Sequence, residues 1–572
     1  MSLPISAGWA TISSVPIKHP PETVTAGPPL HAARSGPLFG FPILTIMVTA
    51  VALFFPTLFF GIPSGHDFEF HMNSWMEVLS QWRLGILYPR WAALAHFGYG
   101  EARFIFYPPV SWMLGAALGS FLPWTIVPAV YEWIALTLSG CSMFLLARRF
   151  MPRRDATFAA ALYAANPYHI VIVYWRSAFA ELLVGALLPL LLLVLLRSEK
   201  NDRTEVLSLS LIVAAAWLTN VPAAVMLTYS LALMLVVAAV VRRSTRPLAI
   251  GALAVLLGLA LAAFYVVPVL YELKWVEIAQ ALSPGVRPQD NFIFTSLNYP
   301  DHDRFNMLIS LLSLAEIILL AFFGFLSRPW RTRAPEFWWM LTAWSAACAL
   351  LLSSVSLVLY RFLPEMRYVQ LPLRWLLCLN VGFALLVTMA SRRWLVRALA
   401  CLAMLAVLAF VWHRVQPPWW DDAGDIAEMQ DHQEDSSGYE GIDEYVPNGA
   451  DVYEIKKDAR RVSFEGNGAS RIRITRWEPE SKAFSANATQ PGKLVLKLFN
   501  YPAWRIEVNG HLVQTGMLQG TGQMVIPVGA GDNQVHVTFA RTRDREIGGL
   551  ISFATVILIL VLIPFNRRSA HL

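Results

Sequence analysis

Long apolar segments dominate this sequence, and they limit the folds that the chain can adopt. Several approach or exceed the ~18–20 residues that an α-helix needs to cross the hydrocarbon of a bilayer. Only 15% of the 572 residues are charged, which is too few for the surfaces of a soluble chain of this length. We therefore predict a mostly α-helical protein that crosses a membrane about 12 times. The predicted spans are 39–61, 124–147, 155–174, 182–197, 205–220, 222–241, 247–270, 307–326, 335–356, 372–390, 396–413 and 547–566, of which 182–197 and 205–220 are short for complete crossings.

Basic residues cluster at the ends of these segments. The chain carries 45 Lys and Arg against 39 Asp and Glu, but their placement follows the positive-inside rule rather than the pattern of a nucleic-acid-binding surface. If residues 1–38 form a disordered cytoplasmic tail, clusters such as Arg148-Arg149 and Arg242-Arg243 fall on the cytoplasmic side. Residues 62–123 and 414–546 then lie outside the cytoplasm, and we expect no nucleic-acid partner.

The outside loop 62–123 is too polar to cross the membrane cleanly. It contains two amphipathic pieces, at about 72–96 and 107–121. A true crossing at 107–121 would place the later basic clusters on the wrong side of the membrane. We therefore predict juxtamembrane helices that lie at the interface.

The segment 414–546 predicts a β-rich domain. Its first part is acidic and loop-like, and its second part alternates between apolar and polar residues as strands do. Asn509-Gly510 is a tight-turn signal. We predict a β-sandwich-like extracytoplasmic module between a transmembrane module (39–413) and a final span with a cytoplasmic tail (547–572). The predicted strands are 493–499, 504–513, 523–528 and 534–540.

Two acids and two histidines follow the first predicted span directly. Asp67 and His71 are four residues apart and share a face if a helix begins here. Asp67 and Glu69 are two residues apart, the minimal spacing for two carboxylates to hold one divalent cation, Mg²⁺ or Mn²⁺, from a loop. His66 lies beside them. A helix cap with solvated charges is the alternative interpretation.

Other polar side chains recur in the outside loops. Prolines next to Arg90 and Tyr107 fix extended turns that would aim these side chains, although tyrosines are also common at membrane interfaces. Arg176 and Glu181 form either an interfacial ion pair or part of a binding site. Lys274 lies in a long loop that ends in a weak metal-binding signal, Asp301-His302-Asp303.

Arg374 stands at the beginning of an apolar span. At the end of a span an arginine can extend its guanidinium to the interface. The same position also suits a ligand for a lipid phosphate, because the planar guanidinium contacts two oxygens at once.

All these charges face the same side of the membrane. An acid in one place and cations in another suit a reaction in which a hydroxyl attacks and an anion leaves: the acid takes the proton, and the cations hold a departing phosphate. Charged residues of the proton-relay kind are largely missing from the middle of the spans, which argues against an ion-coupled transporter.

The motifs resemble the GT-C class of glycosyltransferases. More narrowly, the chain is similar to bacterial membrane proteins described as 6-pyruvoyl-tetrahydropterin-synthase-related and to the neighbouring YfhO-like group, over most of its length beyond residue 38. The stretches that carry the resemblance are His66-Asp67 to His71, 85–91, Phe106-Tyr107-Pro108-Pro109, Trp175-Arg176 to Glu181, Gln370 to Arg374-Trp375, and 501–510.

The resemblance implies a GT-C fold in the bacterial plasma membrane and an inverting transfer of sugar from a polyprenyl-phosphate donor to an extracytoplasmic glycan, lipid or protein. It also implies that Asp67 acts at the acceptor, while a share of Glu69 in that role stays open. The family pattern Phe-Pro-Trp-Arg reads Leu371-Pro372-Leu373-Arg374 here. The arginine is kept, but the aromatic neighbours are not.

Two alternatives to a glycosyltransferase remain open at this point. A flippase for lipid-linked saccharides, or a polysaccharide-export component, needs a polar path through the spans, which the sequence does not indicate. A non-enzymatic envelope scaffold could bind glycan through the β module, but it would not need Asp67, Arg176 and Arg374 together.

Overall fold

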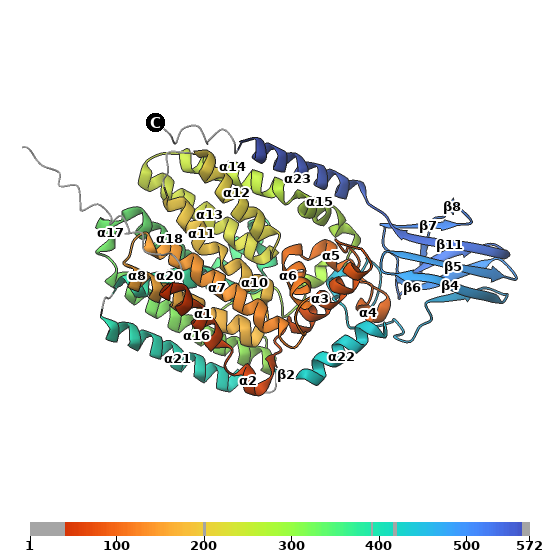
Figure 1. Ribbon diagram of the computed structural model, residues 1–572, viewed down its shortest axis with the longest axis horizontal. Helices are drawn as coiled ribbons and strands as arrows, with labels where there is room; N and C mark the ends of the chain where they lie inside the picture. Colours follow the sequence, from red (N-terminus) through yellow and green to blue (C-terminus); the bar gives the residue numbers. More distant parts are fainter. Residues whose placement is uncertain (1–39, 198–201, 391–392, 416–419, 563–572) are drawn as a thin grey trace, which may run out of the picture. The chain divides into compact units, whose positions relative to one another are not determined.

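The computed structural model of the protein describes residues 40–197, 202–390, 393–415 and 420–562 (Figure 1). The predicted disordered tail 1–38 and the C-terminal residues 567–572 lie outside the described residues. The residues from Phe41 onward belong to one compact unit.

Eight helical segments are long and apolar enough to cross a membrane within the described ranges. Two further pairs of helices, bent by 78° and 93°, pass the same test together. The eight segments are α1–α2 (Phe41–Phe60), α7 (Val127–Arg148), α8–α9–η1 (Arg153–Arg176), α10–α11 (Phe179–Leu196), α13 (Val221–Arg242), α16 (Pro300–Leu326), η7–α20 (Pro372–Ala390) and α21 (Trp394–Val415); the bent pairs join α14 (Arg246–Leu261) to α15 (Ala263–Glu272) and α18 (Pro335–Leu351) to α19 (Leu357–Phe362).

The other two predicted spans are also helices, α12 (Asp202–Trp217) and α23 (Arg543–Leu562). Helix α23 packs along α14 and α15 (Figure 1). The prediction of a polytopic helical membrane protein is therefore confirmed.

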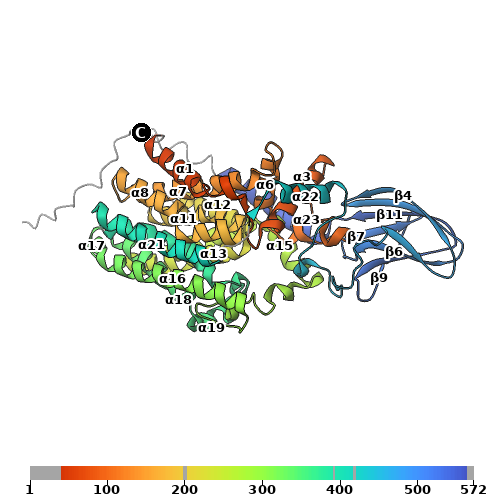
Figure 2. The same ribbon diagram turned by 90° about the horizontal axis from the view of Figure 1, so that it is seen from below.

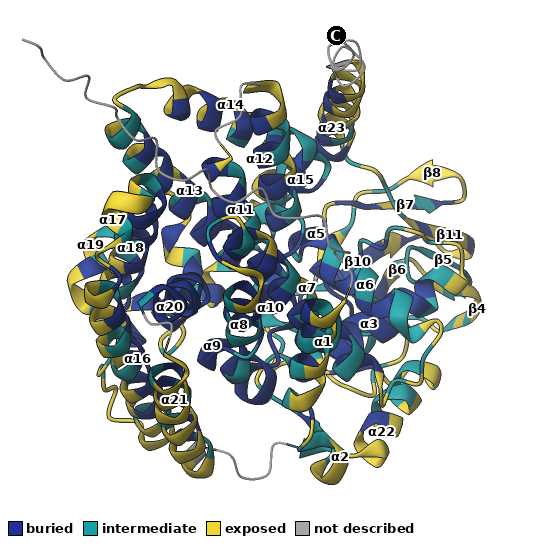
Figure 3. Ribbon diagram, turned by 60° about the vertical axis from the view of Figure 1, so that its left-hand side comes forward, coloured by how far each residue is buried: buried dark blue, intermediate teal, exposed yellow. Residues whose placement is uncertain are grey.

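Burial separates a central helix from the helices at the periphery (Figure 3). In η7–α20, 89% of the most apolar window is buried, whereas in α21 the share is 28%. Exposed Leu405 on α21 and Leu560 on α23 are typical of a lipid-facing surface. The apolar exterior therefore supports the same fold class as the sequence.

The loop 62–123 folds into short helices rather than two long amphipathic ones. These are α3 (Phe68–Arg83), α4 (Ala95–Gly98), α5 (Arg103–Phe106) and α6 (Pro109–Gly119). The helix expected over 72–96 ends at Arg83, because Gly85 adopts a left-handed conformation (φ 84°) and Pro89 follows. Helix α6 has only 11 residues, which is too short for a crossing.

The C-terminal module contains two antiparallel sheets. One has the strand order β3-β6-β10-β9 and the other β4-β5-β11-β7-β8. Side chains from both sheets, such as Leu496 and Val535, share one core, as in a sandwich. The strands are β3 (Val462–Glu465), β4 (Ser470–Glu478), β5 (Ser481–Ala488), β6 (Gly492–Phe499), β7 (Trp504–Val508), β8 (His511–Leu512), β9 (Gly516–Met517), β10 (Gln523–Val528) and β11 (Gly531–Phe539).

The run expected as one strand over 504–513 forms two strands, β7 and β8. Asn509 and Gly510 both have positive φ and make the tight turn between them. Ahead of the sheets lie the short strand β2 (Trp420–Asp421) and helix α22 (Ala423–Glu434). Strand β2 pairs with β1 (Ile62–Pro63), so the start of the C-terminal region is tied to the exit of the first span.

Candidate active site

The loop after the first span packs directly on the end of η1 (Ile172–Arg176), a π-helical turn. The backbone N–H of Asp67 donates to the carbonyl of Arg176 at 2.9 Å, and the N–H of Gly65 donates to Ser177 Oγ at 2.8 Å. A Cβ on Gly65 would lie 2.6 Å from the carbonyl carbon of Arg176. Only glycine permits this approach, which places Asp67, at the start of α3, beside Arg176.

Four charged side chains then form a continuous chain, here called the site cluster: Asp67, Arg176, Glu181 and Arg374. Arg176 Nη1 donates to Glu181 Oε2 at 2.7 Å, and Arg176 Nη2 lies 4.0 Å from Asp67 Oδ2. Arg374 Nε lies 3.5 Å from the same Glu181 oxygen. Sequence positions as distant as 67 and 374 are thus brought together, with two positive and two negative charges.

Tyr168 completes the buried part of the site cluster. Its hydroxyl donates to Glu181 Oε1 at 2.7 Å and accepts from Arg176 Nη1 at 2.8 Å. Arg176 and Glu181 are almost wholly buried. A buried ion pair needs such additional hydrogen bonds, so Tyr168 holds the two charges in place. Sequence reasoning did not single out Tyr168.

Arg374 is buried but keeps unused donors. Its Nε and Nη1 have no hydrogen-bond partner among the described residues. A buried N–H without a partner costs free energy that an acceptor from a ligand would recover. Asp67, in contrast, is 42% exposed at its side chain and so can be reached from outside. The site cluster therefore offers an accessible carboxylate at one end and unsatisfied cationic donors at the other.

Tyr107 and the two predicted histidines surround Asp67. Burial and the charge of Asp67 raise the pKa of Tyr107, while Arg374 and a hydrogen bond with Asn220 act in the opposite direction. Burial lowers the pKa of His71 to about 4, and its ring lies 5.7 Å from that of Tyr107. His71 is therefore a neutral ring packed among aromatic side chains. The pKa of His66 is also lowered, mainly by burial, and its ring lies 6.0 Å from that of Phe305.

Three other predicted site residues make their contacts elsewhere. Arg90 lies over the Tyr88 ring, and its backbone N–H donates to Glu480 of the β module at 3.0 Å. The ammonium of Lys274 lies 3.6 Å from the centre of the Tyr271 ring. Glu69 is exposed on α3.

The neighbourhood of Glu69 differs from that of Asp67. The charge of Glu69 acts on Asp421, and burial raises the pKa of Asp421 to about 6. In the part of the chain that the structure describes, no three side chains of the metal-ligating types are grouped to hold an ion. The described residues therefore form no ready metal site, and the dependence on a divalent cation stays a prediction.

Polar groups inside the spans are more numerous than the sequence suggested. Glu316, in the middle of α16, is fully buried and accepts a hydrogen bond from Asn380 of α20 at 3.1 Å. Buried His169 lies in the segment Arg153–Arg176. The expectation that such residues are largely missing was too strong, because a single acid in an apolar run hardly changes its mean hydropathy.

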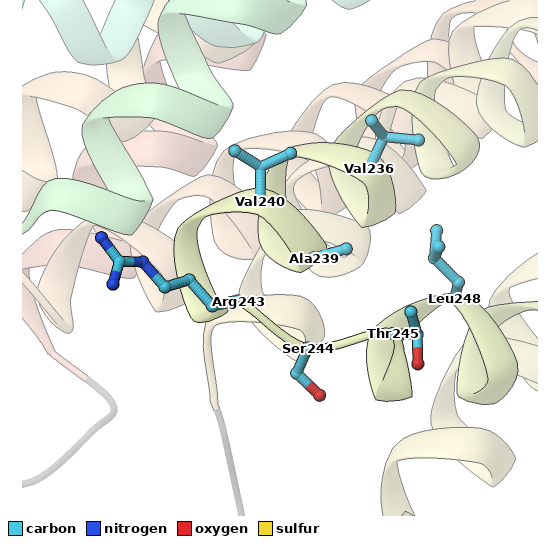
Figure 4. A pocket seen from close by; sticks show the side chains of 7 residues that line it. All are labelled: Val236, Ala239, Val240, Arg243, Ser244, Thr245 and Leu248. Carbon is cyan, nitrogen blue, oxygen red and sulfur yellow. The ribbon is translucent and has the colours of Figure 1, made fainter.

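A separate hollow lies at the turn between α13 and α14 (Figure 4). It has a volume of about 380 Å³ and is lined by Val236, Ala239, Val240, Arg243, Ser244, Thr245 and Leu248. These seven residues include none of Asp67, Arg176, Glu181 and Arg374. The hollow therefore does not belong to the site cluster.

Comparisons with known proteins agree with a membrane protein. A family model described as "6-pyruvoyl-tetrahydropterin synthase related domain; membrane protein" matches residues 104–417, more than half of the chain. No curated protein matches the chain.

Solved structures give weaker matches. One is ArnT from Cupriavidus metallidurans bound to undecaprenyl phosphate, with 14% identity and a TM-score of 0.41, covering 64% of this chain and 63% of that one. Another is the arabinofuranosyltransferase AftD from Mycobacteria, with 18% identity and a TM-score of 0.39, covering 66% of this chain and 28% of that one. Similarities at this level carry no functional argument, and the chain spans less than two thirds of either protein.

Proposed function

Starting from a chain that belongs to the 6-pyruvoyl-tetrahydropterin-synthase-related membrane proteins, we propose that it is a membrane glycosyltransferase of the GT-C class. It moves a sugar from a polyprenyl-phosphate donor to an acceptor hydroxyl outside the cytoplasm. The family description itself names no such activity. The proposal rests on the site cluster and on the motifs of the outside loops.

One observation carries the proposal. Asp67 is accessible, and the site cluster leads from it to the buried Arg374, whose Nε and Nη1 have no hydrogen-bond partner within the described ranges. The two ends match the two demands of sugar transfer from a lipid phosphate: a base at the hydroxyl and a cation at the leaving group.

The proposed reaction is a single displacement. The acceptor oxygen attacks the anomeric carbon from the side opposite the phosphate, and Asp67 accepts the hydroxyl proton. The bond between the anomeric carbon and the phosphate oxygen breaks, and its electron pair leaves with the polyprenyl phosphate. Arg374, together with Arg176, stabilises the charge of the departing phosphate. The anomeric configuration is inverted.

The buried carboxylate of Glu181 has a positioning role in this proposal. It binds Arg176 at 2.7 Å and lies 3.5 Å from Arg374, so it holds both guanidinium groups near one point. Two arginines without this acid would repel each other in a medium of low dielectric constant. Glu181 thus balances one of the two positive charges, and the other remains available to the phosphate.

The experiment that tests the proposal compares strains. In a strain that lacks the protein, mass spectrometry should find polyprenyl-phosphate sugar accumulated and one sugar missing from a surface glycan, lipid or protein. Expression of the wild-type chain should restore that sugar, and expression of Asp67→Asn should not. Unchanged lipid-linked and surface sugars in the deletion strain would contradict the proposal.

A further inference from the structure

The chain makes a strained turn just before the central helix η7–α20. Gln370 follows the short helix η6 (Met366–Val369) and has φ 60° and ψ −70°. Across this residue, the N–H of Leu371 donates to Val369 O at 2.7 Å. These values describe the rare, strained form of the γ-turn. A residue with a side chain persists in such a conformation only where its surroundings hold it there.

The geometry of this turn sets the direction of the segment that carries Arg374. Leu371 is extended (φ −97°, ψ 106°), as a residue before proline prefers to be. The ring of Pro372, the first residue of η7 (Pro372–Trp375), fixes its own φ. The N–H of Arg374 then donates to Leu371 O at 3.0 Å. Because these residues have little freedom, Gln370 is the joint that determines where the backbone of Arg374 lies.

The side chain of Gln370 supplies the restraint that the turn needs. Its Nε2 donates to Ala281 O at 2.7 Å. Ala281 is buried in η3 (Ile278–Leu282), in the loop after α15. This loop is itself attached to the C-terminal region, because the N–H of Glu277 donates to Val446 O at 2.9 Å. The amide of Gln370 therefore ties the joint to a loop that is held in place.

Glutamine at this position combines a steric cost with a hydrogen bond. Glycine would adopt the positive φ without strain, but it has no amide to reach Ala281. A restrained joint matters because Arg374 has few restraints of its own. Its Nε lies 3.5 Å from Glu181, and its Nε and Nη1 have no hydrogen-bond partner among the described residues. The place of this guanidinium therefore depends on the place of its backbone.

We propose that Gln370 is a positioning residue for Arg374. By holding the strained turn it directs η7, and with it the two unused guanidinium donors, toward the place of the lipid phosphate. This inference rests on the proposed function, in which Arg374 binds that phosphate, but it makes a separate claim. Gln370 acts on binding through Arg374 and not through a contact of its own with the lipid.

The test measures binding of polyprenyl phosphate to purified full-length protein in nanodiscs. Gln370→Ala removes the hydrogen bond to Ala281 but keeps a side chain at the strained turn, so the turn should relax. Affinity for polyprenyl phosphate should fall by about 10-fold, the upper end of the effect of one lost hydrogen bond. Gln370→Gly removes the same bond without strain at positive φ. It should therefore bind more tightly than the alanine variant.

A matched control and a second background separate positioning from general stability. Gln280→Ala makes the same substitution at an exposed residue of η3, next to the acceptor Ala281, and should leave affinity unchanged. In protein that already carries Arg374→Gln, adding Gln370→Ala should cause no further loss of affinity, because the two residues act as a unit. If the alanine variant does not fold, Gln370→Gly takes its place in both backgrounds.

The outcomes separate the inference from the proposed function. Wild-type affinity in Gln370→Ala would overturn the inference alone. So would weaker binding by the glycine variant than by the alanine variant, or an equal loss from Gln370→Ala in the presence and absence of Arg374. Wild-type protein that binds no polyprenyl phosphate, or Arg374→Gln that binds it as wild type does, would overturn the proposed function as well.

Discussion

Two buried clusters in this molecule pair arginine with glutamate, and they differ in how many of their polar atoms have hydrogen-bond partners. The site cluster joins Asp67, Arg176, Glu181 and Arg374. The second, here called the junction cluster, joins Glu272 at the end of α15, Tyr501 of the β module and Arg545 at the start of α23. In the junction cluster Arg545 donates to both oxygens of Glu272, at 2.7 and 2.8 Å, and the Tyr501 hydroxyl donates at 2.5 Å.

The difference lies in what each cluster leaves unpaired. Both oxygens of Glu272 are bound, and all three junction residues are buried. The site cluster leaves two donors of Arg374 without a hydrogen-bond partner in the described part of the chain, and it leaves Asp67 half exposed. A complete buried ion pair holds elements together, whereas an incomplete one keeps a place for a ligand. Burial of charge alone does not mark function.

The largest effect is expected at the exposed end of the site cluster. Asp67→Asn keeps the shape of the side chain but removes its basicity and charge. Assistance by a general base is worth roughly 10²–10⁴-fold. Turnover should therefore fall at least about a hundredfold while binding of the lipid donor changes little. The measurement is single-turnover sugar transfer in nanodiscs together with donor binding.

Glu69→Gln is the control for Asp67→Asn, because it makes a similar change two residues away on α3. A mild effect there would leave Asp67 acting alone, and a comparable loss would point to a shared metal ion. A near-normal rate for well-folded Asp67→Asn would contradict the assignment and direct attention to Asp301 and Asp303.

A smaller loss is expected at the buried end. Arg374→Lys keeps the positive charge but removes the planar group that contacts two phosphate oxygens. Binding of polyprenyl phosphate and turnover should each fall by about 10- to 100-fold, with normal insertion and melting temperature. Full activity of the lysine variant would reduce Arg374 to a residue that extends to the interface and would weaken the contrast between the clusters.

A substitution in the junction cluster should lower the stability of the protein and leave its turnover unchanged. Glu272→Gln leaves the buried Arg545 without its counter-charge, and breaking a buried pair in this way typically costs about 3–5 kcal/mol. The apparent melting temperature should fall, while the turnover of the molecules that remain folded stays at the wild-type level. A loss of turnover without a loss of stability would show that the junction cluster also takes part in the reaction.

The mildest substitution tests on which side of the membrane the C-terminal region lies. We predict that residues 414–546 lie outside the cytoplasm, so a cysteine at the exposed Ser437 should react with a membrane-impermeant thiol reagent in intact cells, after permeabilisation of any outer membrane. A cysteine at Ser13 should be protected. The opposite pattern would invert the predicted orientation.

The sequence predicted the spans well and the assembly of the site only in part. Apolar runs locate helices such as α13 because membrane insertion depends mainly on composition. The place of Arg90 and Lys274 depends on how the β module packs against the loops, which no local pattern encodes. Tyr168 lay within the predicted span 155–174, and its hydrogen bonds with Glu181 and Arg176 depend on how residues 172–181 fold.

The π-helical turn η1 makes the length of one segment as important as its residues. Such a turn accommodates one residue more than an α-helix would. Deleting Val173 would shorten this turn by one residue and shift the backbone of Arg176 relative to Ile172. Asp67 would lose the carbonyl that positions it, although every member of the site cluster would still be encoded. In relatives of this protein, an insertion or deletion here would therefore be as informative about lost activity as a substitution of Asp67 itself.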